Sequence, residues 1–242
     1  MKIIYIKRKY IYILLSILIC IIVLNTIKNK LAITTYLPIG NKIIGIDPGH
    51  GGVDLGASGK GGASENEINL AISLKLKRLI EQSGGIVVIT RDNKDGLYTE
   101  KSKTIREKKT EDLQNRKELI NNSNCDIFLT IHLNSFPQSK YYGAQTFYKE
   151  NCEKSKKLAY MVQKELRNIL DEDNKRVPQS RDDVYLIREV EAPSILVECG
   201  FLSNPTEEKL LQDEKYQEKI AWSIYSGIIK YFNEIESGHN FD

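Results

Sequence analysis

The sequence predicts one α/β domain with a largely parallel central sheet flanked by helices, preceded by an N-terminal membrane segment. Two observations support the domain. Short apolar segments alternate with helical ones along about 200 residues, the order typical of βαβ units. Several apolar segments have hydrophobic residues at consecutive positions, as in strands covered on both faces. The expected strands are 43–46, 86–90, 126–131, 144–148, 184–187 and 194–197.

Helical periodicity separates most of these strands. Apolar residues recur at helical spacing over 68–80, and Ser83-Gly84-Gly85 ends that helix. Further helices are expected over 111–121, 153–170, 206–212 and 214–232. Residues 94–110 are charged and lack periodicity, which predicts a loop longer than an ordinary connection. One hypothesis is that this loop docks an accessory protein.

The first 30 residues differ from the rest in charge. They carry six basic residues and no acidic one, so the net charge of +3 leaves the remainder at −3. An apolar run of 14 residues, 11–24, lies between the basic clusters. With Tyr10 and residues 25–27 the run extends to 18 residues, a length between a signal-peptide core and a spanning helix, which needs roughly 20 residues. Because no cleavage motif follows, we favour a membrane anchor over a cleaved signal, with the following domain exported.

Composition also predicts where the linker, the catalytic domain and the C-terminal tail begin and end. Residues 31–41 are expected to be a linker, because Pro38 and Gly40 punctuate them, and 42–235 to be the catalytic domain. Residues 236–242, which include His239, are expected to be a disordered tail. The mildly acidic body excludes a nucleic-acid partner, because phosphate backbones bind clustered Lys and Arg.

The cysteines indicate neither a zinc ribbon nor a disulfide framework. The four cysteines are Cys20, Cys125, Cys152 and Cys199, and no two have C-x-x-C spacing. We interpret Cys125 and Cys199 as small buried hydrophobic residues on strands.

Chemistry-bearing side chains follow three expected strands. His50 follows the strand 43–46, His132 follows 126–131, and Glu198 closes 194–197. Sites in open α/β sheets gather beyond the carboxyl ends of the strands. A fourth candidate, Glu65, opens the first helix after the Gly-rich loop that carries His50.

Two imidazoles and one carboxylate are the ligand set of a catalytic zinc ion, and a second carboxylate could act as general base. Spacing does not decide whether Glu65 or Glu198 is the ligand. Glu67 competes with Glu65, although the two point to different sides of a helix. An open alternative is that His50 and His132 are ordinary polar residues at the ends of strands and bind no metal. The Gly-rich stretch 49–62 fits neither a phosphate loop nor a dinucleotide fingerprint.

Six motifs identify a family. They are Asp47-Pro-Gly-His50-Gly-Gly, Gly62-Ala-Ser-Glu65-Asn-Glu-Ile-Asn69-Leu, Thr90-Arg91-Asp92, Asp112-Leu-Gln-Asn-Arg116, Ile131-His132-Leu-Asn-Ser135 and Val197-Glu198-Cys-Gly-Phe-Leu-Ser-Asn204. In this order they resemble the zinc-dependent N-acetylmuramoyl-L-alanine amidases of the amidase-3 family. The resemblance implies one zinc ion held by His50, Glu65 and His132, with Glu198 as the catalytic glutamate. It implies peptidoglycan as substrate, cleaved between N-acetylmuramic acid and L-alanine.

The stretches 104–113 and 143–148, and the lack of a wall-binding module, resemble the sporulation branch of that family. Those amidases prepare spore cortex for muramic-δ-lactam formation and germination. Arg91, Asn134 and Ser135 are candidate substrate-binding residues. Two alternatives are a non-catalytic peptidoglycan-binding module and a cysteine peptidase using Cys199. On a strand, Cys199 would point away from the face of its neighbour Glu198.

Overall fold

The computed structural model describes residues 7–31 and 37–237 of the chain. The chain divides into two compact units after Tyr36, and the sheet lies in the second. The first unit contains helix α1, Arg8–Leu31.

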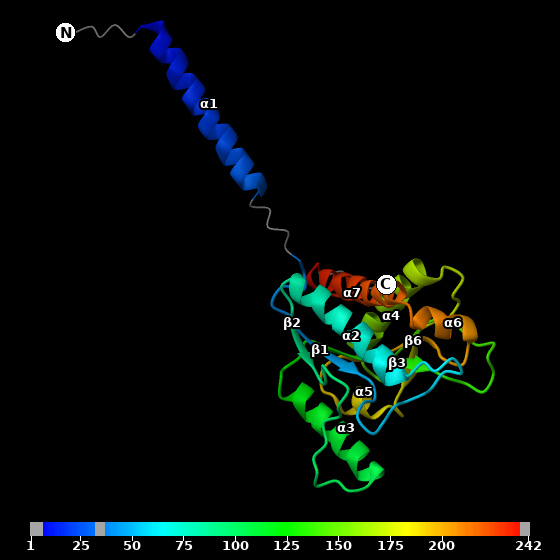
Figure 1. The fold of residues 1–242 in the computed structure, drawn as a ribbon. Coiled ribbons are helices and arrows are strands. Elements are labelled where there is room, and N and C mark those ends of the chain that lie inside the picture. The colour runs from blue at the N-terminus through cyan, green and yellow to red at the C-terminus, as the bar shows by residue number, and fades with distance from the viewer. Residues whose placement is uncertain (1–6, 32–36, 238–242) are drawn as a thin grey trace. The chain divides into compact units, whose positions relative to one another are not determined.

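The described sheet has six strands in the order β2-β1-β3-β6-β4-β5. Figure 1 labels β2, β1, β3 and β6. The first four are parallel, β4 runs antiparallel to β6, and β5 is parallel to β4. The predicted α/β fold with a largely parallel sheet is confirmed. The strand bounds are β1 Ile43–Pro48, β2 Ile86–Ile89, β3 Ile127–Asn134, β4 Gln145–Lys149, β5 Gln179–Arg181 and β6 Ser194–Phe201.

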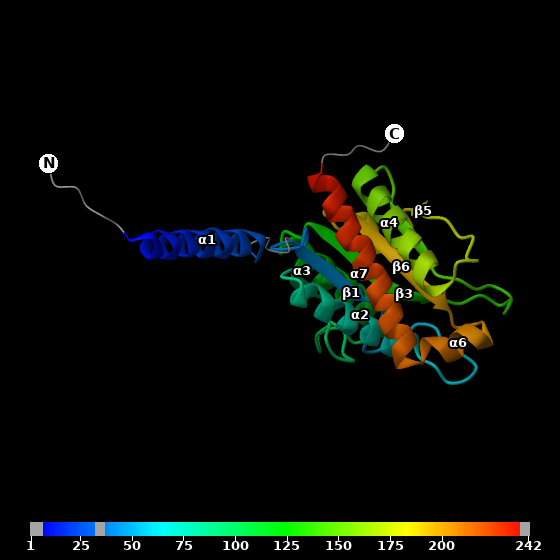
Figure 2. The same cartoon turned by 90° about the horizontal axis from the view of Figure 1, so that it is seen from above.

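Helices cover both faces of the sheet. On one face α2 (Glu65–Gln82), α7 (Glu214–Glu236) and α4 (Glu153–Leu170) lie side by side, as Figure 2 shows from above. Their apolar side chains and those of the sheet form the main core. The other face carries α3 (Ile105–Asn121) and α5 (Tyr185–Glu189), and α6 (Pro205–Leu211) joins β6 to α7. Both faces of β1, β3 and β6 are therefore buried, which explains their consecutive apolar residues.

Two predicted elements are wrong. Helix α3 begins at Ile105, inside the expected loop 94–110. A capping box starts it: the Glu107 amide donates to Thr104 Oγ1 at 3.1 Å, and the Thr104 amide donates to Glu107 Oε2 at 2.9 Å. The expected strand 184–187 is instead mostly helix α5, because Leu186, Ile187 and Val190 pack against the sheet at helical spacing.

The predicted membrane segment is not supported. No helix among the described residues has both the length and the hydropathy needed to cross a membrane. The physical reason lies in the apolar run, since 14 residues of α1 rise only about 21 Å, against a hydrocarbon core of about 30 Å.

The sheet-containing unit begins at Leu37, within the range expected to be a linker. Ile39 is fully buried in the main core, and the Asn41 amide donates to the Gly84 carbonyl at 3.0 Å. At the other end α7 extends to Glu236 and is capped at Ser237. The remainder of the predicted tail, with His239, lies outside the described residues, as do residues 32–36.

Candidate metal centre and active site

The loop that leaves β1 brings His50 to the carboxyl edge of the sheet. His50 has a left-handed backbone with φ of 64°, which is uncommon outside glycine. Gly49 before it lies against the His132 ring, where an added Cβ would come within 2.3 Å of the imidazole. A glycine is therefore required at this position for the two histidines to approach.

Two buried arginines hold the backbone of this loop. Arg91 donates through Nε to the carbonyls of Pro48 and His50, at 2.9 and 2.7 Å, and through Nη2 to that of Gly49, at 3.0 Å. Arg116 donates through Nη1 to the Pro48 carbonyl at 2.9 Å and through Nη2 to the His50 carbonyl at 2.6 Å. These bonds fix the direction in which the His50 side chain leaves the backbone.

Asp47 balances this buried charge. Its carboxylate accepts hydrogen bonds from Arg116 Nη1 at 2.7 Å and from the Thr90 and Thr130 hydroxyls, both at 2.6 Å. Burial by itself would raise the pKa of Asp47, but the Arg116 guanidinium and the two hydroxyls lower it below its ordinary value. Asp47 and Arg116 are each only 1% exposed, so they form a buried ion pair beneath the loop.

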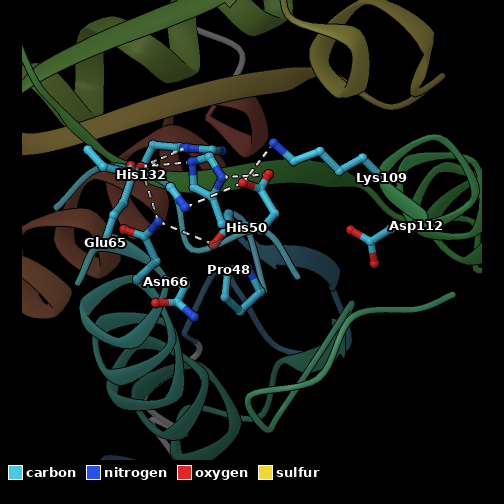
Figure 3. Close-up of polar contacts among 12 residues, drawn as sticks. Pro48, His50, Glu65, Asn66, Lys109, Asp112 and His132 are labelled. Atoms are coloured by element: carbon cyan, nitrogen blue, oxygen red, sulfur yellow. Dashed lines mark hydrogen bonds and ion pairs between the residues drawn. The ribbon is translucent and has the colours of Figure 1, made fainter. Parts of the chain in front are cut away.

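Three potential metal-ligand atoms converge above this network (Figure 3). Glu65 Oε1 lies 3.1 Å from His50 Nε2 and 3.1 Å from His132 Nδ1. All three ligand atoms lie within 4.8 Å of one another, and the two rings meet edge to face. The three side chains come from the loop after β1, the first residue of α2, and β3. Two imidazoles and a carboxylate match the donor set of catalytic zinc sites.

Neighbouring groups orient these three side chains. Asp54 Oδ2 lies 2.9 Å from His50 Nδ1, and Lys109 binds the other Asp54 oxygen at 2.9 Å. Burial lowers the pKa of His50, but hydrogen bonds to Asp54 and Glu65 outweigh it and raise the pKa to about 9. Glu65 Oε2 accepts from the Ala57 amide at 2.7 Å. Burial by itself would raise the pKa of Glu65, but the hydrogen bonds and charges of His132 and His50 outweigh burial and lower this pKa.

Glu67, the competing ligand, turns away from the site. Its carboxylate pairs with Lys94 at 2.5 Å, and its side chain is 54% exposed. The helix therefore directs only Glu65 toward the two histidines.

Glu198 lies beside His132, since the two are partners on the neighbouring parallel strands β6 and β3. It is 8% exposed, and its Oε2 atom has no hydrogen-bond partner among the described residues. Burial, with a smaller contribution from the Glu65 carboxylate, raises the pKa of Glu198 to about 7. Glu198 and Asn134 line a cavity of about 560 Å³.

Comparisons with known proteins agree with this site. Residues 44–230 match the N-acetylmuramoyl-L-alanine amidase family, amidase-3. The chain belongs to this family. The germination-specific N-acetylmuramoyl-L-alanine amidase of Bacillus subtilis is 41% identical over 82% of this chain and 83% of its own length. The solved CwlD amidase of Clostridioides difficile, in complex with the GerS lipoprotein, is 55% identical, with a TM-score of 0.78 over 80% of this chain and 99% of that one. The LytC amidase of Bacillus subtilis is 31% identical over 85% of this chain but 38% of its own.

The structure corrects the expectation for Arg91 in this amidase. Arg91 is 4% exposed, and besides the loop carbonyls it donates to the carbonyls of Asn66 and Asn93. Its guanidinium is thus used within the protein, which favours a positioning role for Arg91 over contact with substrate. Asn134 ends β3 in the cavity wall, whereas Ser135 follows on an exposed part of the loop.

The cysteine-peptidase alternative is wrong. Cys199 is fully buried and belongs to the main core, on the face of the sheet covered by α2, α4 and α7. Burial and the nearby Glu198 raise the pKa of its thiol well above the ordinary value. A thiol that is inaccessible and protonated is not a nucleophile.

Sequence reasoning did not identify the groups that support the site. Asp54 stands four residues after His50, and Asp47 and Arg116 are within the recognised motifs. The side-chain partners of Asp47 lie 43 to 83 residues away in the chain. Spacing therefore carries no signal for these contacts.

Proposed function

We propose that this amidase hydrolyses the bond between N-acetylmuramic acid and L-alanine in peptidoglycan, in a zinc-dependent reaction. The observation that supports the proposal is the convergence of His50, Glu65 and His132 beside the buried Glu198, in a chain of this family. Three protein ligands leave a fourth zinc position open for chemistry, as in other catalytic zinc sites.

In this proposal His50 Nε2, Glu65 Oε1 and His132 Nδ1 hold the zinc ion. When bound, zinc polarises the scissile carbonyl and lowers the pKa of the attacking water from about 16 to about 7. Asp54 accepts a hydrogen bond from the Nδ1–H group of His50, so that Nε2 presents its lone pair to the metal. The amides of Ala57 and Leu133 hold the Glu65 carboxylate in place, at 2.7 and 3.0 Å.

Glu198 is the proposed general base and acid. It takes a proton from the attacking water and delivers it to the departing alanine amine. In the metal-free protein burial raises the pKa of this carboxyl to about 7, and a raised pKa makes it a better acceptor for the proton of the attacking water. Asn134 lies in the same cavity wall and is the better placed of the two remaining candidates for substrate contact.

Intact peptidoglycan tests this function. Wild-type protein supplied with zinc should release stem peptides that begin with L-alanine, as detected by mass spectrometry. The chelator-treated protein should release none, and the isosteric Glu198→Gln variant should release them about 10²–10⁴-fold more slowly. Peptidoglycan binding without release by the zinc-loaded wild type would instead favour the non-catalytic binding module.

We propose that the physiological substrate is spore cortex. The similarity to the germination-specific amidase supports this, at 41% identity over most of both chains. Cortex digested by the protein should yield muramic acid that a downstream enzyme can convert to δ-lactam. Equal activity on vegetative and cortex peptidoglycan, with no δ-lactam defect in a deletion strain, would contradict the cortex role.

We further propose that the protein acts outside the cytoplasm. The sheet-containing unit that begins at Leu37 is the proposed catalytic domain, and residues 1–30 are the proposed export segment. The apolar run of 14 residues is within the length of a signal-peptide core. A reporter enzyme that works only after export, fused to residues 1–41, tests the segment. A silent reporter on a stable fusion would refute it.

An accessory protein is proposed at residues 94–110, because the similar CwlD amidase was solved in complex with a lipoprotein. Within this stretch Ile105 is 64% exposed at the start of α3. We expect Ile105→Asp to abolish recovery of the partner in a pull-down from sporulating cells. Ile235→Asp is the control, because Ile235 is also an exposed isoleucine, 45% exposed, but lies on α7 outside the proposed stretch. Unchanged recovery with Ile105→Asp would end the proposal.

A further inference from the structure

One face of the strands β6, β4 and β5 projects side chains into the cavity beside Glu198. Side chains alternate along a strand, so Glu198 and Leu196 share a face of β6, and Gln145 and Phe147 share a face of β4. Phe147 and Leu196 pack together with Ile187 of α5, which shows that this is the face opposite the main core. The cavity of about 560 Å³ opens on this face, within the range of small-ligand sites.

The charges that line this cavity are mainly positive. Lys175, Arg176 and Arg181 contribute three cationic groups, and Glu198 is the one acidic residue in the lining. The Arg181 guanidinium lies over the Phe147 ring, 5.2 Å from its centroid, which holds it against the cavity wall. The cavity is therefore suited to an anion more than to a neutral ligand.

Both arginines are oriented by the protein and retain donors for a ligand. Arg176 donates through Nε to the Tyr142 carbonyl at 2.7 Å and through Nη1 to Gln145 Oε1 at 2.9 Å. Arg181 donates through Nε and Nη2 to Asp183, at 2.7 and 3.1 Å. In the described part of the chain, Nη2 of Arg176 and Nη1 of Arg181 have no hydrogen-bond partner. Preoriented guanidinium groups with spare N–H donors are typical carboxylate binders.

The two sides of the scissile amide differ in charge. On the sugar side, the carboxyl of muramic acid is consumed in the amide bond, which leaves hydroxyl and acetamido groups. On the peptide side, the chain beyond alanine carries free carboxylates. The amine that receives the proton from Glu198 also belongs to the peptide side, so the peptide must depart next to that residue.

We infer that this cavity is the peptide subsite and that Arg181 and Arg176 bind a carboxylate of the peptide beyond L-alanine. The inference rests on the proposed function and adds to it the direction in which substrate lies across the site. An extended peptide advances about 3.3–3.6 Å per residue, so the residue after alanine lies within one or two such steps of the amine. These arginines select for peptides with a free carboxylate at that point.

Two synthetic N-acetylmuramoyl peptides test the subsite: one with free carboxylates on the residues after L-alanine, and the same peptide with carboxamides there. Wild-type kcat/KM should favour the carboxylate substrate by roughly 10- to 100-fold, the size expected for a charge-assisted hydrogen bond. In Arg181→Gln and Arg176→Gln this ratio should fall toward 1, mainly through KM, and Arg181→Lys should restore part of it. Arg188→Gln is the matched control, since Arg188 also pairs with an adjacent carboxylate, Glu189, but does not line the cavity.

Calorimetric titration of the two free peptides separates this inference from the reaction. Preferential binding of the carboxylate peptide, lost in Arg181→Gln, supports the subsite even if no substrate is cleaved, in which case the proposed function fails alone. Cleavage with equal wild-type kcat/KM for both substrates overturns the subsite and leaves the function standing. A preference that survives in both glutamine variants also overturns it.

Discussion

Replacing Arg116 by methionine should destabilise the domain strongly. Methionine has a similar length but no charge, so the substitution leaves the Asp47 carboxylate, 1% exposed, without its cation. It also removes the donors to the carbonyls of Pro48 and His50 and the ion pair with Asp112 Oδ2 at 2.8 Å. Removing one partner of a buried ion pair costs about 3–5 kcal/mol, because the remaining charge is buried and uncompensated.

For a domain of this size, that loss in the free energy of unfolding corresponds to a melting temperature lower by roughly 6–20 °C. Denaturant titration of metal-free protein measures it, with Arg188→Met as control. Arg188 is an exposed arginine paired with its neighbour Glu189, and we expect no measurable change there. A loss below about 1 kcal/mol for Arg116→Met, the scale of a surface ion pair, would refute the buried-pair reasoning.

The pH dependence of this defect has a definite sign. In the wild type the pKa of Asp47 is lowered, so its contribution to stability is present above the unfolded pKa, about 3.9, and is lost as the pH falls through the folded value. In Arg116→Met, burial should instead raise the pKa of Asp47, and protonation then relieves the penalty. The difference in stability between the two proteins should therefore be smaller at pH 5 than at pH 7.5. A difference that grows on acidification would contradict this account.

Three further predictions concern the site. Glu198→Gln should keep its zinc, measured by elemental analysis, and lose about 10²–10⁴-fold in kcat. His132→Ala should lose both zinc and activity. Normal turnover in Glu198→Gln would show that Glu198 is not the general base. Asp54→Asn should weaken zinc binding about 10- to 100-fold in a chelator competition, because Asp54 orients His50 through its 2.9 Å contact with Nδ1; unchanged affinity would show that the contact is dispensable. Gly49→Ala would place a methyl group 2.3 Å from the His132 ring, so we expect a zinc-poor protein, and full occupancy by elemental analysis would show that the ring can move aside.

The sequence predicts the parts of this fold that depend on local pattern. Consecutive apolar residues indicate β1, β3 and β6, and their shared carboxyl edge brings His50, His132 and Glu198 together as expected. The motifs then add Glu65 as the third potential ligand. These successes have one physical basis, since parallel strands necessarily end on the same side of a sheet.

The failures have a different physical basis. The start of α3 depends on a capping box at Thr104 and Glu107, a local signal that is readable but is surrounded by charged residues without apolar periodicity. Helix α5 is five residues long, and over such a length Leu186 and Ile187 fit a strand equally well. Arg91 follows a strand within a run of polar residues, 90–95, and nothing in that run distinguishes a surface arginine from one that is buried as a donor to the loop around Pro48.

The buried network also couples the stability of the domain to the metal site. A single non-glycine residue in the left-handed region costs about 1–2 kcal/mol, and His50 is held there by five hydrogen bonds from Arg91 and Arg116 to the carbonyls of residues 48–50. The cation that neutralises Asp47 in the core is therefore the same one that orients a potential zinc ligand. Arg116→Met should accordingly reduce zinc affinity together with stability. Among the described residues Arg116 forms no hydrogen bond with the side chains of the three potential ligands, so this effect would be transmitted through the backbone of the loop. Because His50 lacks the conformational freedom of glycine, relaxing these carbonyls would let its backbone return to the favoured region and carry the imidazole away from Glu65.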